Sequence, residues 1–323
     1  MLRAAGLTAV ALGVAGCGGG HRAAPPAHRA TPAARAAARP ARLRLLAVRA
    51  LPAPVQLPAL AVRGREALAL GGLDAADGSV AAVVRVAPGA PRAAGTLPQA
   101  VHDAGAAALG GRVYLFGGGT AAGPTDAIVA LGRDGGARTV GRLPAPSSDL
   151  EAVRLGNRIM VVGGYTGTRP QRTVLAFAPG RGLRVAGRLP RPVRYAVAAA
   201  AGGRLLVAGG TDGVHASADV LSLDPASGRA RRVARLPHPL AHAAGAVLGG
   251  TLFVLGGRGD GLATQRRDIW AIDPASGRVR RAGRLPVGLS DLSAVALGGR
   301  LLVVGGRDRA GRVHHELLEM GLR

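Results

Sequence analysis

The sequence predicts an all-β propeller of six blades, on the basis of three observations. A glycine pair follows a short apolar run six times, at intervals of 46, 46, 46, 47 and 49 residues. A Leu-Pro dipeptide begins 20 residues before every pair, and another glycine lies seven residues before it. Three markers in constant register indicate a repeat architecture, and a period in the forties is typical of propeller blades. The pairs are Gly71-Gly72, Gly117-Gly118, Gly163-Gly164, Gly209-Gly210, Gly256-Gly257 and Gly305-Gly306.

Each repeat is expected to begin with a hairpin of two inner strands. The four residues before each glycine pair are apolar, as in Leu205 to Ala208 and Leu301 to Val304. A continuous apolar run predicts a strand that is covered on both faces, as stacked blades would cover it. Small residues precede this run, as in Ala196 to Ala201, and they suit a strand close to a central axis. The dipeptides in between, such as Gly202-Gly203, favour the positive φ of a two-residue turn.

A third and a fourth strand complete each predicted blade. The third strand, for example Asp219 to Leu223, follows a polar loop and ends at the turn Asp224 to Gly228. In this turn the proline presets φ and the glycine accepts a positive φ. The fourth strand, Arg229 to Leu236, leads to the next Leu-Pro, where proline is expected to end it.

The two ends of the chain are expected to share the last blade. The sixth copy runs out after its third strand, His315 to Met320, and a strand-like stretch, Leu43 to Leu51, precedes the first Leu-Pro. This N-terminal stretch would supply the missing fourth strand and remove an open sheet edge. We therefore predict a closed ring of six blades over residues 43–323, and a monomer.

The order of apolar strand, Gly-Gly, variable loop, third strand with an Asp-Pro turn and fourth strand resembles the kelch repeat. The resemblance covers about residues 43 to 323. Kelch repeats usually carry an aromatic residue in the third strand and Trp in the fourth, whereas here only Phe177 and Trp270 keep aromatic bulk in a third strand. Packing between blades must then depend on aliphatic side chains. Kelch propellers bind proteins, sugars or cofactors, so the resemblance implies a fold and not one function.

The N-terminal residues are expected to export and anchor the chain. Residues 1–16 combine a charged start with an apolar segment that is too short to span a membrane, which is typical of a signal peptide. Val14-Ala15-Gly16-Cys17 resembles the lipobox of bacterial lipoproteins, which implies that Cys17, the only cysteine, is lipidated. The alternative is an accidental cysteine after a plain signal peptide.

Residues 17–42 are rich in Ala, Pro and Arg and are expected to form a disordered tether. The expected location is therefore the extracytoplasmic side of a cell membrane, on the periplasmic or outer face. The membrane is expected to be a partner through the lipid anchor.

The formal net charge of +24 allows two interpretations. The arginines could attract anionic lipid headgroups or acidic wall polymers, because basic residues near a membrane gain about 1 kcal/mol each. Alternatively, a GC-rich genome would enrich Arg, Ala, Gly and Pro together, as seen here. Nucleic-acid binding is not expected, since the chain has export signals and aromatics at 2% offer few stacking platforms.

Two positions in every repeat are expected to face the central opening on the loop face. The first lies fourteen residues before each glycine pair and holds Leu57, Asp103, Asp149, Tyr195, His242 and Asp291. The second directly follows each pair and holds Leu73, Gly119, Tyr165, Thr211, Arg258 and Arg307. Together they predict a polar pocket at the axis with both signs of charge.

These residues suit a small-molecule or peptide site. The three aspartates would accept hydrogen bonds, Arg258 and Arg307 would clamp a carboxylate, and Tyr165 or Tyr195 would stack on a sugar ring. The alternative is structural, because an aspartate in a turn often caps its own loop by bonding nearby backbone N–H groups.

Three functions remain open at this point. The first is a non-enzymatic, membrane-tethered module that binds a protein or glycan through the loop face. The second is a sugar mutarotase or epimerase with a sialic-acid-like substrate, which the kelch resemblance implies because some exported bacterial kelch propellers are sialic acid mutarotases. Such a reaction needs only an acid and a base. The third is a purely structural propeller.

No cofactor and no metal are expected. Copper oxidases on related propellers need a Cys-Tyr cross-link, and Cys17 lies in the lipobox. His314-His315-Glu316 lies on an expected strand, where adjacent side chains point to opposite faces.

Overall fold

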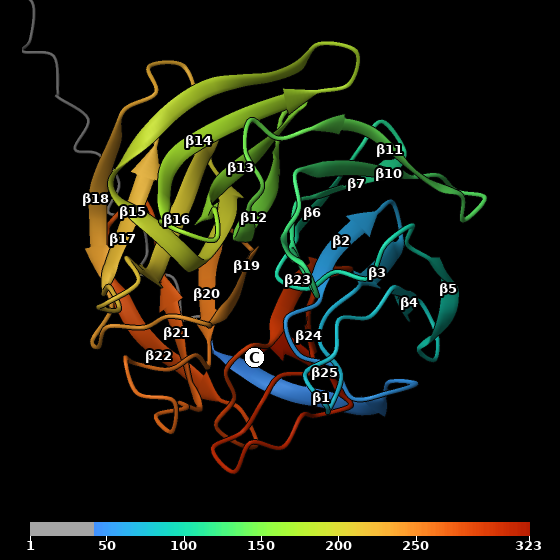
Figure 1. The fold of residues 1–323 in the computed structure, drawn as a ribbon. Helices are drawn as coiled ribbons and strands as arrows, with labels where there is room; N and C mark the ends of the chain where they lie inside the picture. Colours follow the sequence, from blue (N-terminus) through green and yellow to red (C-terminus); the bar gives the residue numbers. More distant parts are fainter. Residues whose placement is uncertain (1–41) are drawn as a thin grey trace, which may run out of the picture. The chain divides into compact units, whose positions relative to one another are not determined.

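The computed structural model describes residues 42–323, which form strands joined by turns and loops (Figure 1). The chain divides into two units, and these residues belong to the second, Pro40–Arg323. Within residues 42–323 no helix has the length and hydropathy needed to cross a bilayer. The expectations for residues 1–16, for Cys17 and for almost all of the tether fall outside the described residues.

Four antiparallel sheets have four strands each. One comprises β2 (Ala59–Arg63), β3 (Glu66–Leu70), β4 (Ala82–Ala87) and β5 (Arg92–Thr96). The next comprises β6 (Gly105–Leu109), β7 (Arg112–Phe116), β10 (Ala127–Leu131) and β11 (Ala137–Arg142). Between β7 and β10 in the sequence, β8 (Gly119–Thr120) and β9 (Gly123–Pro124) form a separate two-stranded sheet. The third comprises β19 (Ala244–Leu248), β20 (Thr251–Leu255), β21 (Asp268–Ile272) and β22 (Val279–Arg284). The fourth comprises β23 (Ser293–Leu297), β24 (Arg300–Val304), β25 (Glu316–Leu322) and β1 (Leu43–Ala50).

The remaining strands form one seven-stranded sheet, which the sequence did not predict. Its strands are β12 (Ser148–Leu155), β13 (Arg158–Tyr165), β14 (Gln171–Ala178), β15 (Gly182–Ala201), β16 (Arg204–Thr211), β17 (Asp219–Leu223) and β18 (Ala230–Arg235). The expectation of six separate blades is therefore wrong for this part of the chain. The structure has four separate four-stranded blades and one larger sheet in the propeller.

The larger sheet arises because β15 continues where the sequence predicts a break. Pro190 was expected to end a strand, but it lies inside β15. The ladder between β14 and β15 pairs Thr173 with Arg188 and then Gln171 with Val193, so Pro190 falls in an unpaired interval. A proline is tolerated there because no ladder bond needs its missing N–H. From Arg194 onward, β15 pairs with β16 instead.

The expected closure of the ring is confirmed. β1 pairs antiparallel with β25, with Leu43 opposite Leu322 and Ala50 opposite Glu316. The N-terminal strand is therefore the outer strand of the last sheet, and the two ends of the described chain are held together by backbone hydrogen bonds. Figure 1 shows the sheets arranged around a central axis, with β2, β6, β12, β19 and β23 innermost.

The core consists of aliphatic layers between neighbouring sheets, as the shortage of aromatics predicts. Phe253 and Leu301 are fully buried in the layer between the β19–β22 sheet and the last sheet. One aromatic cluster exists in this range, where Phe177 lies 5.0 Å from Tyr114 and 5.3 Å from Phe116 between ring centroids. Trp270 packs against another layer.

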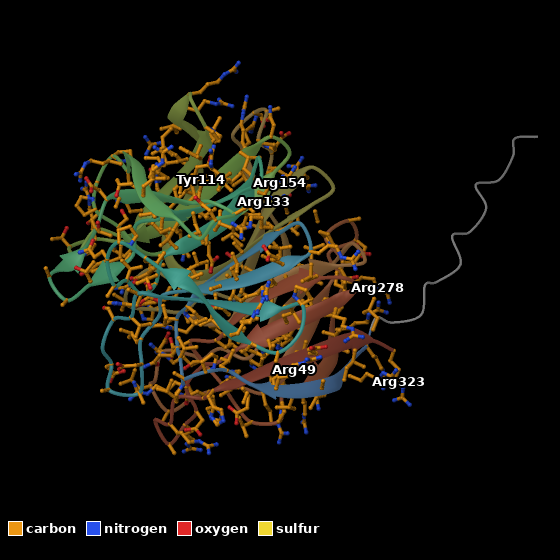
Figure 2. All side chains as sticks on the ribbon, turned by 90° about the vertical axis from the view of Figure 1, so that its right-hand side faces the viewer. Arg49, Tyr114, Arg133, Arg154, Arg278 and Arg323 are labelled. Carbon is orange, nitrogen blue, oxygen red and sulfur yellow. The ribbon has the colours of Figure 1, made fainter. Side chains whose placement is uncertain are left out.

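Arginine side chains project from much of the outer surface (Figure 2). Several pair with a carboxylate on the neighbouring strand, as Arg142 does with Asp126 at 2.7 Å and Arg281 with Asp268 at 3.2 Å. Others, such as Arg133 and Arg278, are exposed. Exposed pairs of this kind contribute about 0 to 1 kcal/mol each, so the arginines contribute little to the stability of the fold.

Candidate functional site

The six residues at the first predicted register share an unusual backbone conformation. Their φ angles lie between 52° and 60°. Residues other than glycine seldom adopt this left-handed region, because the side chain crowds the backbone. The six are Leu57, Asp103, Asp149, Tyr195, His242 and Asp291. We call them the axial ring.

Backbone hydrogen bonds connect the members of the axial ring. The N–H of Asp103 donates to the carbonyl of Leu57 at 3.2 Å, and that of Asp149 donates to Asp103 at 2.8 Å. The N–H of His242 donates to Tyr195 at 3.1 Å, that of Asp291 to His242 at 2.9 Å, and that of Leu57 to Asp291 at 2.7 Å. These bonds pass from one inner strand to the next around the axis. The left-handed conformation therefore belongs to the construction of the ring, since the chemically inert Leu57 shares it.

One half of the ring fixes the tautomer of His242. The Nδ1 atom of His242 lies 2.5 Å from Oδ1 of Asp291, and Nη2 of Arg258 lies 2.8 Å from its Nε2. Because a guanidinium can only donate, Nε2 must accept, and the ring proton is on Nδ1 and donates to Asp291. The second oxygen of Asp291 accepts a bond from Ser290 Oγ at 2.6 Å.

The surroundings of Asp291 keep this carboxyl ionised. Burial by itself would raise its pKa, but the hydrogen bonds from His242 and Ser290 and the charge of Arg258 outweigh burial. The pKa of Asp291 therefore lies below its ordinary value. His242 thus lies between an anion and a cation.

Tyr195 links the two halves of the ring. Its ring stacks on His242, with centroids 3.6 Å apart and planes inclined by 24°. Its hydroxyl donates to Oδ2 of Asp103 at 3.4 Å and accepts from Nη2 of Arg194 at 3.2 Å. Burial, followed by the charges of Asp103 and Asp149, raises its pKa, so the side chain remains a neutral phenol. Because the guanidinium of Arg194 also lies 4.7 Å over this ring, the expected stacking of Tyr195 on a sugar is not favoured.

Arg194 is a site residue that the sequence reasoning missed. It forms an ion pair with the buried Asp149, and its guanidinium lies 4.0 Å over the ring of Tyr165. Burial raises the pKa of Asp149, and the charge of Arg194 offsets part of this rise. A signal did exist, because the residue before each ring position is polar in five of six repeats: Gln56, His102, Ser148, Arg194 and Ser290, with Ala241 as the exception.

Asp103 differs from the other two aspartates of the ring. Burial, followed by the charges of Asp149 and Asp291, raises its pKa well above the ordinary value, although Arg194 and Tyr195 act in the opposite direction. The pKa of Asp103 is therefore raised, whereas that of Asp291 is lowered. His102 lies beside Asp103 with Nε2 4.0 Å from Asp103 Oδ2, and burial lowers the pKa of His102. The ring thus holds two carboxyl groups whose surroundings shift their pKa values in opposite directions.

The two predicted arginines have different surroundings. Arg307 forms an ion pair with Asp77 at 2.9 Å, and Gln56 donates to the same carboxylate oxygen at 2.7 Å. Arg258 donates to His242 and forms no ion pair with any residue in the described range. Both arginines line a cavity of about 440 Å³. Arg258 is therefore the cation that is better placed to meet an anionic ligand.

The predicted residues are divided between two further cavities. A cavity of about 350 Å³ opens among the loops and includes Arg194, Tyr195, His242, Arg258 and Asp260 in its lining. A narrower cavity of about 50 Å³ lies at the ring itself and is lined by Asp103, Asp149, Tyr195, His242 and Asp291. Asp103 and Asp149 therefore face the axis, Asp291 lines both the ring cavity and the cavity of Arg258 and Arg307, and the arginines face the loops. Tyr165 lines neither cavity, and it lies under Arg194.

The described residues contain no group of three or more His, Cys, Asp or Glu side chains arranged to hold a metal ion. His314, which the sequence singled out with His315 and Glu316, is buried. Its Nε2 lies 3.0 Å from Asp308 and its Nδ1 lies 3.0 Å from Glu316. These contacts tie a loop to the start of β25, which is a structural role.

Comparison with known proteins supports the fold alone. No protein-family model matches the chain, and no curated protein matches it. Among solved structures, that of YjhT is similar with a TM-score of 0.72 and 16% sequence identity. The match covers 84% of this chain and 95% of the other. At this identity the likeness extends to the arrangement of the strands, and the function has to be argued from the site.

Proposed function

We propose that the protein is a ligand-binding propeller that takes a carboxylate-bearing ligand, a sugar acid or a peptide, on its loop face. The observation that carries the proposal is the state of Arg258. Its guanidinium is oriented by His242, lines a cavity of about 350 Å³ and has no ion-pair partner among residues 42–323. A carboxylate would receive charge-assisted, bidentate hydrogen bonds from such a group.

The cavity supports this choice of ligand. Volumes of about 300 to 1,000 Å³ are typical of small-molecule sites. Arg194 brings a second positive charge to the same cavity, although Asp149 already pairs with it. Asp260 brings a negative charge to the lining of the same cavity. Its carboxylate accepts a hydrogen bond from the N–H of Ala216. The polar groups thus offer cations for an acid and acceptors for hydroxyl or amide groups.

Calorimetry of the purified protein with paired ligands tests the proposal. Sialic acid and galacturonic acid are expected to bind, and galactose and N-acetylglucosamine are expected to bind far more weakly. Arg258→Ala should weaken binding of the acid roughly 10- to 100-fold, because a hydrogen bond to a charged group contributes about 1.5 to 3 kcal/mol. Arg307→Ala is the matched control, since Arg307 already has Asp77 as its partner. Equal binding of acidic and neutral sugars, or an unaffected Arg258→Ala variant, would contradict the proposal.

A mutarotase is the second candidate, favoured by the opposite pKa shifts of Asp103 and Asp291. Two carboxyl groups whose pKa values are shifted apart can serve as general acid and general base. NMR of freshly dissolved sialic acid would show faster exchange of its anomers with the protein than without it. Asp103→Asn would abolish the acceleration while binding persisted. If the anomers exchanged at the same rate with the protein as in buffer alone, the mutarotase activity would be excluded and the binding function would remain.

We further propose that a lipid on Cys17 anchors the chain outside the cytoplasmic membrane, with residues 17–42 as the tether. The lipobox-like Val14-Ala15-Gly16-Cys17 supports this proposal. Metabolic labelling with an alkyne-bearing fatty acid should label the wild-type protein. A Cys17→Ser variant should remain unlabelled. Labelling of Cys17→Ser to the same extent would overturn the anchor.

We also propose that the larger sheet acts as two blades, which gives a six-bladed propeller of the kelch type. β14 and β16 pair with different halves of β15. One hydrophobic layer lies between the two halves of the sheet, and another lies between its second half and the β19–β22 sheet. A crystal structure should show six repeats at similar angular intervals about the axis. A ring with five equal intervals would contradict it.

A further inference from the structure

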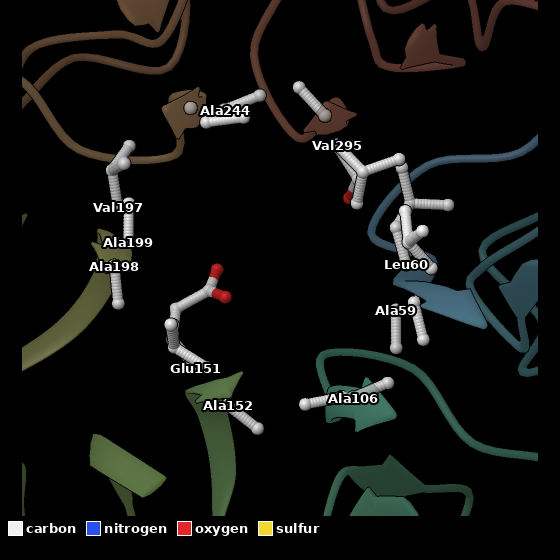
Figure 3. A pocket seen from close by; sticks show the side chains of 18 of the residues that line it. Ala59, Leu60, Ala106, Glu151, Ala152, Val197, Ala198, Ala199, Ala244 and Val295 are labelled. Atoms are coloured by element: carbon white, nitrogen blue, oxygen red, sulfur yellow. The ribbon is translucent and has the colours of Figure 1, made fainter. Parts of the chain in front are cut away.

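A channel along the axis forms a further cavity, separate from the cavity of about 350 Å³ on the loop face. Its volume is about 370 Å³, and its walls come from the inner strands β2, β6, β12, β15, β19 and β23. Most lining side chains are small or aliphatic, such as Leu60, Ala106, Val197 and Val295, which Figure 3 shows around the opening. Most lining side chains are therefore apolar, backbone groups of the inner strands are also exposed to the channel, and Glu151 is the acidic residue in the lining.

Glu151 points its carboxyl group into the middle of this channel (Figure 3). The side chain has no hydrogen-bond or ion-pair partner within residues 42–323. Burial raises its pKa to about 8. By accessible surface Glu151 is only partly buried, because its carboxyl group is reached from the channel, so a ligand in the channel could contact it.

The blade does not require a carboxyl group at this position. Glu151 lies two residues after its axial-ring residue, and the same position in the other repeats holds Ala59, Gly105, Val197, Ala244 and Ser293. Five of six repeats thus form their inner strand with a small or apolar residue. Glu151 in β12 therefore departs from the repeat pattern, and the strand does not need a carboxyl group there for its own structure.

The titratable groups that share a cavity with Glu151 are mostly acidic. The narrow cavity at the axial ring brings Glu151 together with Asp103, Asp149 and Asp291, and with the neutral Tyr195 and His242. Arg194 pairs with Asp149 and lines neither this narrow cavity nor the channel. Arg154 also lines the channel, but its Nε donates to the carbonyl of Gly156 at the hairpin turn. No cation in the described structure neutralises Glu151.

We propose that the axial channel binds a small primary amine as its ammonium ion, with Glu151 as the counter-ion and the aliphatic walls around the alkyl chain. The walls match an unbranched alkyl group, and the acidic end of the channel matches the ammonium head. The chain has no lysine side chain that could supply the ammonium group.

Binding is expected to displace a proton. Without ligand, Glu151 is mostly protonated at neutral pH, because its pKa is raised to about 8. An ammonium ion stabilises the carboxylate, so Glu151 ionises and its proton passes to the buffer. The net change at pH 7 is one ammonium bound and close to one proton released. At pH 9 most of the carboxylate is already present, and little proton is released.

Calorimetry with n-butylammonium at pH 7 and pH 9 tests the proposal, in two buffers that differ in ionisation enthalpy. The heat at pH 7 should depend on the buffer, in proportion to nearly one released proton, and the heat at pH 9 should not. n-Butanol has the same alkyl chain without the charge and should bind at least tenfold more weakly. Glu151→Gln should weaken binding of the amine at least tenfold.

A loop-face variant separates this proposal from the proposed function. Arg258→Ala should leave butylammonium binding intact, and Glu151→Gln should leave binding of acidic sugars intact. Circular dichroism of Glu151→Gln checks that the variant is folded. Equal binding of butanol and butylammonium, unchanged binding by Glu151→Gln, or no binding of the amine at either pH would overturn the amine site.

Discussion

The two ends of the inner strands both contain left-handed residues, but for different reasons. At the hairpin-turn end the left-handed residue is a glycine, as at Gly110 and Gly202, and a Cβ added there would have no atom within 4 Å. At the loop-face end, a Cβ on Gly209 or Gly305 would overlap a backbone carbonyl of the neighbouring repeat. At the turn end, glycine is therefore required by the local backbone conformation. At the loop-face end, it is also required by close contacts between repeats.

This difference explains where functional chemistry gathers. The axial ring lies at the loop-face end, where backbone bonds between repeats hold six non-glycine residues at φ of 52° to 60°. Such strain is stable only when the surroundings impose it. Side chains held this way have little freedom, which suits a binding site. The turn end has neither the strain nor the side chains.

The largest expected effect comes from adding a methyl group at each end. Gly209→Ala should destabilise the protein by about 3 kcal/mol or more, because left-handed strain of about 1 to 2 kcal/mol adds to overlap with the carbonyl of Leu240. Gly202→Ala has the strain without the overlap and should lose only about 1 to 2 kcal/mol. Urea unfolding of both variants measures the difference. Equal losses would show that contacts between repeats do not distinguish the two ends.

The next effect concerns the channel between the two ends. Because the folded-state pKa of Glu151 is raised to about 8 from an ordinary 4.5, the folded state binds this proton more tightly than the unfolded state. The contribution to stability is complete below pH 4.5 and is lost as the pH rises to about 8. The difference between these two pKa values corresponds to at most about 5 kcal/mol, and access of solvent from the channel should reduce the loss to a few kcal/mol.

Urea unfolding of the wild type and of Glu151→Gln between pH 4 and pH 9 measures this loss. Asp103 has a raised pKa too, so the wild type alone would not identify the group responsible. The difference in unfolding free energy between the two proteins isolates the effect of Glu151. As the pH rises, the wild type should lose stability relative to the variant. A difference that stays constant with pH would mean that Glu151 is already ionised in the folded protein.

A smaller effect is expected at the hydrogen-bonded half of the ring. Asp291→Asn replaces an ionised acceptor by a neutral amide opposite Nδ1 of His242, and it should cost about 1 to 2 kcal/mol. Nitrogen NMR of the imidazole should show the proton on Nδ1 in the wild type. Asp77→Asn provides an exposed control on an ion pair and should cost less than about 1 kcal/mol. A proton on Nε2 in the wild type would contradict the arrangement with Arg258.

Most of the fold could be predicted from the sequence because its determinants are local. The spacing of Gly209, Pro237 and their equivalents marks turns and strand ends, and turn chemistry depends on the residue itself. The break expected at Pro190 failed because a proline ends a strand only where a ladder bond needs its N–H. Whether such a bond exists depends on the neighbouring strand, which the sequence pattern does not contain.

The candidate site could be predicted only in part. The axial ring was found because its members occupy one register of the repeat. The partners of Arg307 and Arg258 could not be foreseen, because they depend on loop conformations that bring Asp77 and His242 beside them. Glu151 was missed because it breaks the repeat pattern at a position that becomes a channel only when the strands surround an axis.

The smallest expected effect tests what Tyr195 contributes to the ring. Its hydroxyl contacts are long, 3.4 Å to Asp103 and 3.2 Å to Arg194, so they are weak hydrogen bonds. Tyr195→Phe keeps the stack on His242 and should lose less than about 1 kcal/mol in urea unfolding. Tyr195→Ala removes the stack and the contact with Arg194 as well, and it should lose clearly more.

If Tyr195→Phe and Tyr195→Ala were equally destabilised, the hydroxyl would be the anchor of the ring. If they differ as expected, the aromatic face holds His242 and Arg194 in position. In that case Tyr195→Phe should also keep the affinity for acidic sugars, because Arg258 is oriented by His242 and not by the hydroxyl. The two measurements together would show whether the loop-face end is held by stacking, as the short distance of 3.6 Å between the Tyr195 and His242 rings indicates.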